Sequence, residues 1–256
     1  MLSVISEKAN DKFSRVRGQM NMGNGTQTGG YSSYFLVTTC AFVTALIASN
    51  IVAVKLISVW GLVLPAAIVV FPLSYIIGDV LTEVYGYASA RKVIWLGFTC
   101  NLFVVLVFWI GRVLPAASFW KGQESYVQIL GFTPRLLVAS FIAYLMGEFS
   151  NSFVLAKMKI ATKGKWLWTR TIGSTLIGEG IDSLVFITLA FYGTMPHNIL
   201  LFTIGTQWLV KCLYEAAATP LTYLVVGFLK KCEDLDVYDY DTKFNPFLFP
   251  GSERIK

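Results

Sequence analysis

Seven ionisable side chains lie inside long apolar runs of this 256-residue chain. They comprise two bases and five acids, namely Lys55, Lys211, Asp79, Glu148, Glu179, Asp182 and Glu215. An ionised group at the centre of a membrane costs about 2.5 to 3.5 kcal/mol, so seven would cost about 20 kcal/mol, more than the net stability of about 5 to 15 kcal/mol of a typical domain. These groups must therefore be paired, protonated or turned toward a watery cavity. Five acids against two bases leave a balance of minus three, which bound protons or a cationic or donor-rich ligand would offset.

Three of the apolar runs repeat one pattern, in which a glycine precedes an acid and polar residues follow three and four positions after that acid. The three sets are Gly78, Asp79, Thr82, Glu83; Gly147, Glu148, Asn151, Ser152; and Gly178, Glu179, Asp182, Ser183. Offsets of three and four place side chains on one face of a helix, and the glycines allow neighbouring backbones to approach closely. We therefore expect three helices to turn these faces toward a common interior cavity, with Asn50 and Asn101 as candidates to join it.

Each of these groups also has a purely structural interpretation. Lys211 and Glu215 lie four residues apart and could neutralise each other. Lys55 lies near the outer end of its run, where a lysine can extend to the interface. Glu83 and Arg112 lie near interfaces, where solvation accounts for them. The acids of the repeated pattern could join helices by hydrogen bonds alone, although their clustering favours a functional site.

The composition indicates that lipid surrounds much of the chain. Charged residues make up 14% of it against about 25% in soluble domains, and the mean hydropathy is +0.61. Six apolar runs reach the roughly 20 residues that a helix needs to cross a membrane, at about 34–59, 62–84, 93–114, 134–157, 170–192 and 199–229. We predict an all-α integral membrane protein with six transmembrane helices, in which Pro220 kinks the last one.

Basic residues are divided unevenly between the two sides of such a bundle. One side receives Lys8, Lys12, Arg15, Arg17, Arg91, Lys92, Lys157, Lys159, Lys163, Lys165, Arg170, Lys230, Lys231, Lys243, Arg254 and Lys256, sixteen in all. The other side receives three, Arg112, Lys121 and Arg135. Positive charge marks cytoplasmic loops, so we predict both termini in the cytoplasm. The domains expected are a flexible N-terminal tail (1–33), a six-helix transmembrane domain (34–230) and a cytoplasmic C-terminal tail (231–256).

Motifs for enzymatic chemistry are missing from the sequence. It contains no HExxH, GxSxG, P-loop or GxGxxG, and its one histidine, His197, lies in a short outer loop. We therefore expect no catalytic residue, no metal and no cofactor. Orientation explains the net charge of +6, so we expect membrane lipids and no nucleic acid as partners.

Four long stretches of the sequence resemble one family. The run FPLSYIIGDVLTEVYGYASARKVIWLGF from Phe71 is similar to the second-helix signature of the YhhQ-type queuosine precursor transporters, also called the vitamin uptake transporter family. Three later blocks also resemble it: PRLLVASFIAYLMGEFSNSFVLAKMK from Pro134, TKGKWLWTRTIGSTLIGEGIDSLVFITLAFYG from Thr162 and EDLDVYDYDTKFNPF from Glu233. The resemblance covers about residues 34–249.

The resemblance implies a six-helix fold similar to the substrate-binding components of energy-coupling-factor transporters. It further implies import, across the inner (cytoplasmic) membrane, of the 7-deazaguanine precursors of queuosine, namely preQ0, preQ1 or queuine. The family's intramembrane polar positions fall on Asn50, Asp79, Glu148, Asn151, Glu179, Asp182 and Lys211, to which we add Glu215 as an eighth candidate. Some relatives carry neutral amides at the positions of Glu148 and Glu179, so charge is not required there throughout the family.

A deazaguanine base suits these residue types. Its N1–H and exocyclic amine can donate to a carboxylate, and its O6 can accept from Lys211, Asn50 or Asn151. Its flat ring could stack on an aromatic side chain, for which the candidates are Phe71, Tyr75, Phe149, Phe153 and Trp208. The sequence does not show which carboxylate accepts hydrogen bonds from the base.

Two other functions are compatible with the same residues. A substrate-binding subunit of an ATP-driven vitamin importer could dock its partner through the small residues Ala41 and Ala45, although we do not expect a dedicated ATP-driven module. An intramembrane enzyme could use Asp79 and Asp182 as a carboxylate pair. For an importer, Glu148, Glu179 or Glu215 could take up a proton with the substrate. A homo-oligomer is compatible with all of these.

Overall fold

The computed structural model describes residues 32–59, 62–131, 134–194 and 196–248. The chain divides into Met1–Ser33 and Tyr34–Lys256, and the predicted N-terminal tail lies almost entirely outside the described residues. The second unit contains, in order, α2 (Ser33–Val52), β1 (Leu56–Val59), β2 (Leu62–Pro65), the 3₁₀ helix η1 (Ala66–Val69), α3 (Phe71–Tyr85), α4 (Tyr87–Val113), α5 (Gln123–Leu130), α6 (Pro134–Ala161), α7 (Leu167–Phe191) and α8 (His197–Glu233).

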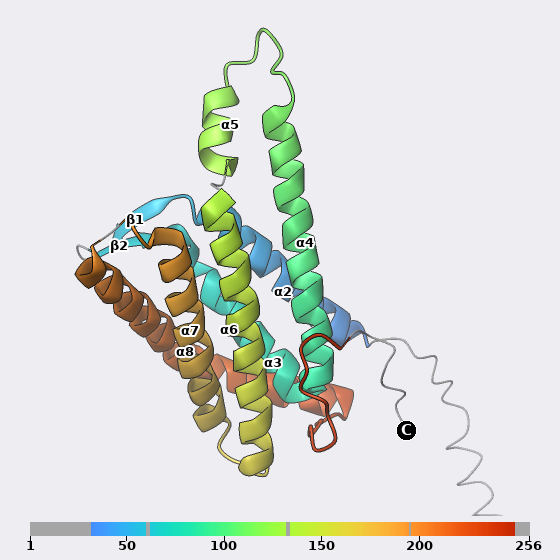
Figure 1. The fold of residues 1–256 in the computed structure, drawn as a ribbon. Coiled ribbons are helices and arrows are strands. Elements are labelled where there is room, and N and C mark those ends of the chain that lie inside the picture. The colour runs from blue at the N-terminus through green and yellow to red at the C-terminus, as the bar shows by residue number, and fades with distance from the viewer. Residues whose placement is uncertain (1–31, 60–61, 132–133, 195, 249–256) are drawn as a thin grey trace, which may run out of the picture. The chain divides into compact units, whose positions relative to one another are not determined.

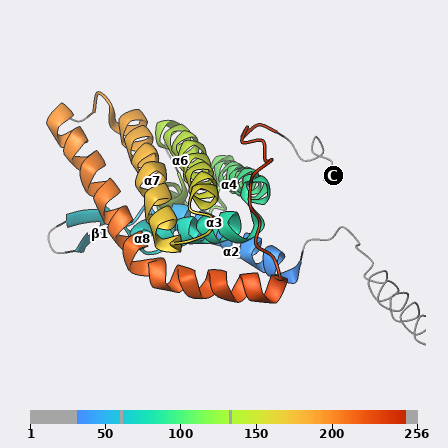
Figure 2. The same ribbon diagram turned by 90° about the horizontal axis from the view of Figure 1, so that it is seen from below.

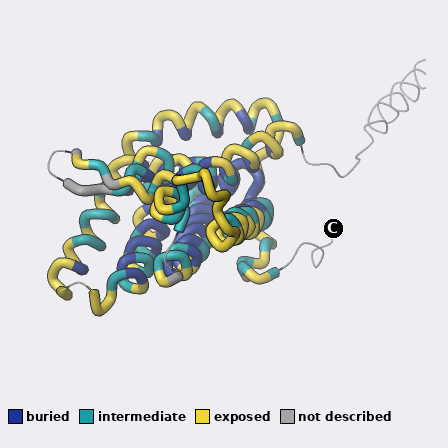
Figure 3. The backbone as a smooth tube through the Cα atoms, turned by 90° about the horizontal axis from the view of Figure 1, so that it is seen from above, coloured by how far each residue is buried: buried dark blue, intermediate teal, exposed yellow. Residues whose placement is uncertain are grey.

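Within the described residues, six helical stretches are long and apolar enough to cross a membrane, which confirms the predicted all-α fold class. They are α2, η1 with α3, α4, α5 with α6, α7 and α8. α6 packs against α7 and α4, and α3 lies between α4, α6 and α8 (Figures 1 and 2). Buried residues gather along the centre of this bundle, and exposed ones cover its outside (Figure 3). The outward-facing side chains include large apolar ones such as Phe103 and Trp109, as expected for contact with lipid.

The two ends of the bundle are built differently. The hairpin end holds β1 and β2, the end of α2 and the beginnings of α3, α6 and α8 (Figure 1). The tail end holds the turn between α3 and α4, the turn between α6 and α7, and the segment 234–248 that follows α8.

The first predicted span, 34–59, is wrong over its last seven residues, 53–59. α2 ends at Val52, and an antiparallel hairpin follows in which Leu56 pairs with Pro65 and Val59 with Leu62. Valine and isoleucine favour extended backbone, and proline is tolerated at the end of an edge strand. As a consequence, Lys55 lies beyond the helix and is exposed, so it does not belong to the buried interior of the bundle.

Other helix boundaries also differ from those predicted. α4 begins at Tyr87, six residues before the predicted start at 93, and α5 occupies part of the predicted loop 115–133. α3 and α4 are separated by Gly86 alone, whose φ of +78° favours glycine. A Cβ there would lie 2.7 Å from Cγ1 of Val237. α8 contains Pro220 and is bent, as expected (Figure 2).

An ordered segment follows α8 and packs on the tail end of α4. Both carboxylate oxygens of Asp239 accept the backbone N–H of Tyr87, at 3.1 and 3.0 Å. Arg91 donates to the carbonyls of Lys243 and Asn245 at 2.9 and 3.0 Å. The Trp95 indole N–H donates to the Pro246 carbonyl at 2.8 Å. Part of the predicted C-terminal tail is therefore fixed to the helices.

Candidate functional site

Two glycines bring α6 and α7 into backbone contact. A Cβ on Gly178 would lie 2.6 Å from Cβ of Asn151 and 3.0 Å from the Gly147 carbonyl oxygen, and a Cβ on Gly147 would lie 3.2 Å from the Gly178 carbonyl oxygen. Any side chain at these positions would force the helices apart. The predicted close approach of the glycine-acid faces is thus present in α6 and α7.

The acids of the repeated pattern gather in the interior with Lys211. The exposed fractions are 1% for Asp79, 0% for Glu148, 1% for Glu179, 5% for Asp182, 6% for Lys211 and 1% for Glu215. They come from α3, α6, α7 and α8, the helices that pack together at the centre. The three predicted faces do meet in one place.

Lys211 joins the two acids of α7. Its Nζ lies 2.5 Å from Oδ2 of Asp182 and 2.7 Å from Oε2 of Glu179, and 4.5 Å from the centre of the Phe71 ring. Mutual neutralisation of Lys211 and Glu215 is therefore wrong. Side chains on a helix tilt toward its N-terminus, which carries the lysine amine toward the hairpin end and away from Glu215, one turn later.

The remaining acids have fewer partners. Asn151 Nδ2 donates to Oδ1 of Asp79 at 2.6 Å. Oδ2 of Asp79 and Oδ1 of Asn151 have no hydrogen-bond partner among the described residues, and neither do the two carboxyl oxygens of Glu148 or those of Glu215. The interior thus contains one ionic group, in which Glu179 and Asp182 share Lys211, and one group of buried, largely unpartnered carboxyls.

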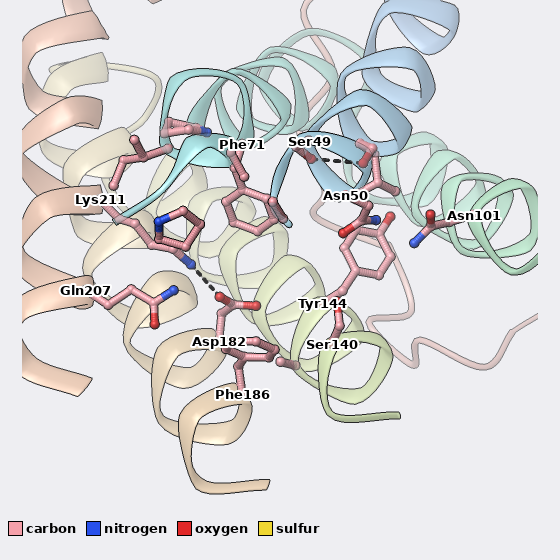
Figure 4. Close-up of a pocket in the computed structure, with 17 residues that line it drawn as sticks. Ser49, Asn50, Phe71, Asn101, Ser140, Tyr144, Asp182, Phe186, Gln207 and Lys211 are labelled. Atoms are coloured by element: carbon pink, nitrogen blue, oxygen red, sulfur yellow. Dashed lines mark hydrogen bonds and ion pairs between the residues drawn. The ribbon is translucent and has the colours of Figure 1, made fainter. Parts of the chain in front are cut away.

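A cavity of about 140 Å³ adjoins the ionic group in the hairpin-end half of the bundle (Figure 4). Asp182 and Lys211 supply its charges, Asn50, Asn101 and Gln207 its amides, and Phe71, Tyr144 and Phe186 its rings. Asn50 and Asn101 lie on one side, beside Tyr144, and Lys211, Asp182 and Gln207 lie opposite (Figure 4). Engineered cavities of about 150 Å³ hold one benzene ring, so this cavity suits a compact flat molecule.

The cavity contains some of the predicted site residues and excludes others. Asn50, Asp182 and Lys211 line it, whereas the other five candidates, Asp79, Glu148, Asn151, Glu179 and Glu215, do not. These five lie one or more helical turns closer to the tail end than the cavity residues of their own helices. Asn101 lines the cavity as expected, and Phe71 is the one predicted stacking candidate that does.

Several cavity residues were missed in the sequence, although a signal for them exists. Gln207 lies four residues before Lys211, Phe186 four after Asp182, and Tyr144 four before Glu148. Residues four apart share a helix face, so extending each predicted face by one turn finds all three. Oε1 of Gln207 is buried without a partner among the described residues and is thus available to a ligand.

A second ionic cluster closes the tail end, and it shows that solvation of Glu83 is the wrong interpretation. Glu83 is 0% exposed and accepts two hydrogen bonds from Arg170, both at 2.8 Å, and one from Lys230 at 2.6 Å. Lys159 Nζ lies 3.7 Å from the same carboxylate and donates to the Glu83 carbonyl at 2.5 Å. We call Glu83, Lys159, Arg170, Lys230 and Asp236 the tail-end network.

Asp236 completes this network from the segment after α8. Its carboxylate lies 2.6 Å from Nζ of Lys159 and 2.8 Å from Nζ of Lys230. Partial burial alone would raise the pKa of Asp236, but the hydrogen bonds from the two lysines lower it overall. The network therefore ties α3, α6, α7 and α8 to the chain beyond the last helix.

Buried cations change the count of basic residues on which the orientation was predicted. Arg91, Lys159 and Arg170 are 3%, 1% and 2% exposed, so they are structural groups and not loop charges. Removing these three residues from the sixteen leaves thirteen basic residues on the side of the termini against three on the opposite side. The asymmetry that predicts cytoplasmic termini is therefore smaller but still present.

Six membrane-length helices around an internal polar cavity define a multi-pass membrane protein of the transporter class. The chain belongs to the family described as "putative vitamin uptake transporter", which its residues 65–225 match. A "Probable queuosine precursor transporter" of Bacillus subtilis (strain 168) is 28% identical over 195 residues, which cover 76% of this chain and 84% of that protein. The chain is accordingly a transporter and not an enzyme.

Two further relatives cover less of the chain. A "Probable queuosine precursor transporter" of Haemophilus influenzae is 29% identical over 135 residues, 53% of this chain and 52% of that protein. The "Queuosine precursor transporter" of Escherichia coli (strain K12) is 26% identical over 122 residues, 48% of this chain and 52% of that protein. No solved structure matches the chain.

Proposed function

We propose that this transporter imports a queuosine precursor, the 7-deazaguanine preQ0, preQ1 or queuine, across the cytoplasmic membrane, and that the cavity beside Lys211 and Asp182 binds it. The observation that carries the proposal is the occurrence of a carboxylate, an ammonium and three amides around one ring-sized cavity. The names of the relatives, which give queuosine precursors as their substrates, support the proposal.

The cavity chemistry matches the edge of a deazaguanine. Asp182 offers acceptors for the N1–H and the exocyclic amine, and Lys211 offers a donor for O6. Side-chain amides of Asn50, Asn101 and Gln207 can donate or accept at the remaining polar atoms. The rings of Phe71 and Phe186 supply apolar surface for the flat base. The five deeper candidates do not line the cavity, so they would act on the substrate indirectly.

Transport requires the site to open alternately to each side. The cavity lies in the hairpin-end half, and the tail-end network and the segment 234–248 lie across the opposite end. We assign the tail end to the cytoplasm because Lys157, Lys163, Lys165 and Lys231 lie there. In this assignment the site is reached from outside, and release inside requires the tail-end network to part.

The subunit alternative loses its predicted docking surface. Ala41 is exposed, but Ala45 is 6% exposed and packs inside the bundle. The two residues therefore do not form one outward face for an ATP-driven partner. A transporter that works without such a module is the simpler proposal.

Rescue of queuosine synthesis tests the function. The chain is expressed in cells that cannot make the precursors, preQ0, preQ1 or queuine is supplied at low concentration, and queuosine is assayed in tRNA. We expect rescue by the native chain and by Glu124→Gln, which changes an exposed acid of α5. Asp182→Asn should not rescue. Failure of the native chain with every precursor, at confirmed membrane expression, would refute the proposal.

A further inference from the structure

Glu148 and Glu215 are two buried carboxyls that form no hydrogen bond and no ion pair with the described residues. They are 0% and 1% exposed, and none of their four carboxyl oxygens has a hydrogen-bond partner among the described residues. Their neighbours Glu179 and Asp182 are equally buried, yet both lie within 2.7 Å of Lys211. A buried carboxylate with neither a cation nor a donor is far costlier than a buried carboxylic acid.

Asn151 indicates what the cluster of unpartnered carboxyls lacks. This side chain is 0% exposed and is held in the cluster by its bond to Asp79, yet its Oδ1 has no donor. Oδ2 of Asp79 lacks one as well. If the acids were ionised, each of these unpartnered oxygens would be an acceptor, so the missing component is a hydrogen-bond donor. The smallest ligand that creates one is a proton, which turns a carboxylate into an O–H donor.

A metal ion fits this place less well. Among the described residues, no group of three or more acidic, cysteine or histidine side chains has the geometry to hold a metal. The acids of the cluster are spread over α3, α6 and α8. Separate protons can neutralise separate carboxyls, whereas one metal ion would need them to converge on one point.

Among the described residues, Lys211 is the one cation that acts directly on this cluster. The titratable groups that interact with Glu148 or Glu215 are Tyr75 and Asp79 of α3, Tyr144 of α6, Glu179 and Asp182 of α7, and Lys211 and Cys212 of α8; Glu83 of α3 interacts with Asp79, and Cys100 of α4 with Tyr144. Lys211 is already shared by two acids, and the charge of Glu83 is matched within the tail-end network.

Close packing connects the charge of this cluster to the shape of the bundle. A Cβ on Gly78 of α3 would lie 3.1 Å from Oε2 of Glu148, so α3 packs directly against this carboxyl. A neutral acid tolerates that contact, whereas an ionised one needs water around it. Glu148 also lies one turn from the cavity residue Tyr144, and Glu215 lies one turn from Lys211. Loss of a proton would therefore loosen α3 next to the cavity wall.

We propose that Glu148, Glu215 and Asp79 form a proton-binding site, and that protons entering with the substrate and leaving to the cytoplasm drive its accumulation. The second half of this inference rests on the proposed import function. In each cycle an incoming proton converts a carboxylate into a neutral acid, which permits the closed packing described here. Its release on the inner side restores the carboxylate and favours opening.

Infrared spectroscopy tests the proton site without any substrate. The full-length protein in lipid bilayers should show the C=O band of protonated carboxyl groups at neutral pH. Glu148→Gln and Glu215→Gln should each remove about one group's share of this band, and the exposed Glu124→Gln should remove none. Absence of the band from the native protein would overturn the inference, as would an unchanged band in both variants. The native measurement stands even if a variant fails to fold.

Proteoliposomes test the coupling, with radiolabelled preQ0 as the probe and the membrane potential clamped. With the outside one pH unit more acidic, one proton per substrate gives an accumulation of about tenfold. Glu148→Gln and Glu215→Gln should reduce it to the ratio seen without a gradient, and Glu124→Gln should keep it. Accumulation by the native protein that ignores the gradient, while exchange of labelled for unlabelled preQ0 proceeds, would overturn proton coupling. Absence of exchange would instead refute the import function, and the infrared result would still decide the proton site.

Discussion

Replacing Glu83 by glutamine removes the only buried anion of the tail-end network and preserves the shape of the side chain. Glu83 now accepts from Arg170 and Lys230 and faces Lys159. Without its charge, these three cations are opposed by Asp236 alone, which is 41% exposed. The variant therefore leaves positive charge uncompensated where the chain is buried.

The structure sets the size of the expected loss. Charge-assisted hydrogen bonds contribute about 1.5 to 3 kcal/mol each, and breaking a buried ion pair from one side costs about 3 to 5 kcal/mol. Arg170 makes two such bonds to Glu83, and Lys230 makes one. Because glutamine retains one acceptor oxygen, part of these bonds survives, and we expect a loss of about 3 kcal/mol. At about 2 to 4 °C per kcal/mol for a chain of this size, Tm should fall by about 6 to 12 °C.

Thermal unfolding of the purified variant in mild detergent measures this change. Glu124→Gln is the matched control, since it makes the same replacement at an exposed position. The double variant Glu83→Gln/Arg170→Met should lose less stability than the sum of the losses of the two single variants. The reason is that Arg170→Met removes a cation that Glu83→Gln leaves unpaired. If Tm of Glu83→Gln lies within about 2 °C of the control, the network does not stabilise the fold and the reasoning is refuted.

Three further changes address the packing, the paired acids and the tail. Gly178→Ala should lose about 1 to 3 kcal/mol in thermal unfolding, because its Cβ would lie 2.6 Å from Cβ of Asn151; Gly205→Ala, which meets nothing within 4 Å, should lose none. Lys211→Met removes the cation shared by two acids, so preQ0 uptake should fall at least tenfold at matched membrane expression. The pKa of Asp236 is lowered on folding, so its stabilisation is complete above its ordinary value of about 3.9 and disappears as pH falls through the folded value. Asp236→Asn should therefore flatten the acid side of a plot of Tm against pH, and an unchanged plot would contradict this.

The sequence predicts those features that depend on one helix at a time. The length of an apolar run identifies a span, and offsets of three and four identify a face, so the six helices and the meeting of Asp79, Glu148 and Asp182 follow directly. The glycines before the acids predict close approach, which Gly147 and Gly178 show. None of these predictions requires knowing which helices are neighbours.

Features that depend on contacts between distant segments were not predictable in this way. Glu83 lies near the end of its helix and appears solvated in the sequence, but Arg170 and Lys230, 87 and 147 residues away, enclose it. The choice of Asp182 over Glu215 as partner of Lys211 likewise depends on how α7 packs against α8. The hairpin after α2 was hidden because its residues are as apolar as the helix that precedes them.

Because Lys55 lies outside the buried interior, the charge balance inside the bundle is more negative than the sequence predicted. With that lysine outside, the interior holds Asp79, Glu148, Glu179, Asp182 and Glu215 against Lys211, five acids against one base and a formal balance of minus four. Lys211 offsets one charge of the pair it contacts, which leaves minus one beside the cavity. The other three acids form no ion pair with the described residues, so bound protons, as proposed above, would allow them to remain buried. The ionic group of Lys211, Asp182 and Glu179 is acidic by one charge and adjoins the cavity. It is suited to a ligand edge rich in donors, as a deazaguanine presents, while bound protons would neutralise the other acids. Substrate recognition and proton binding would then occupy adjacent turns of the same helices, which is the arrangement that coupling between them requires.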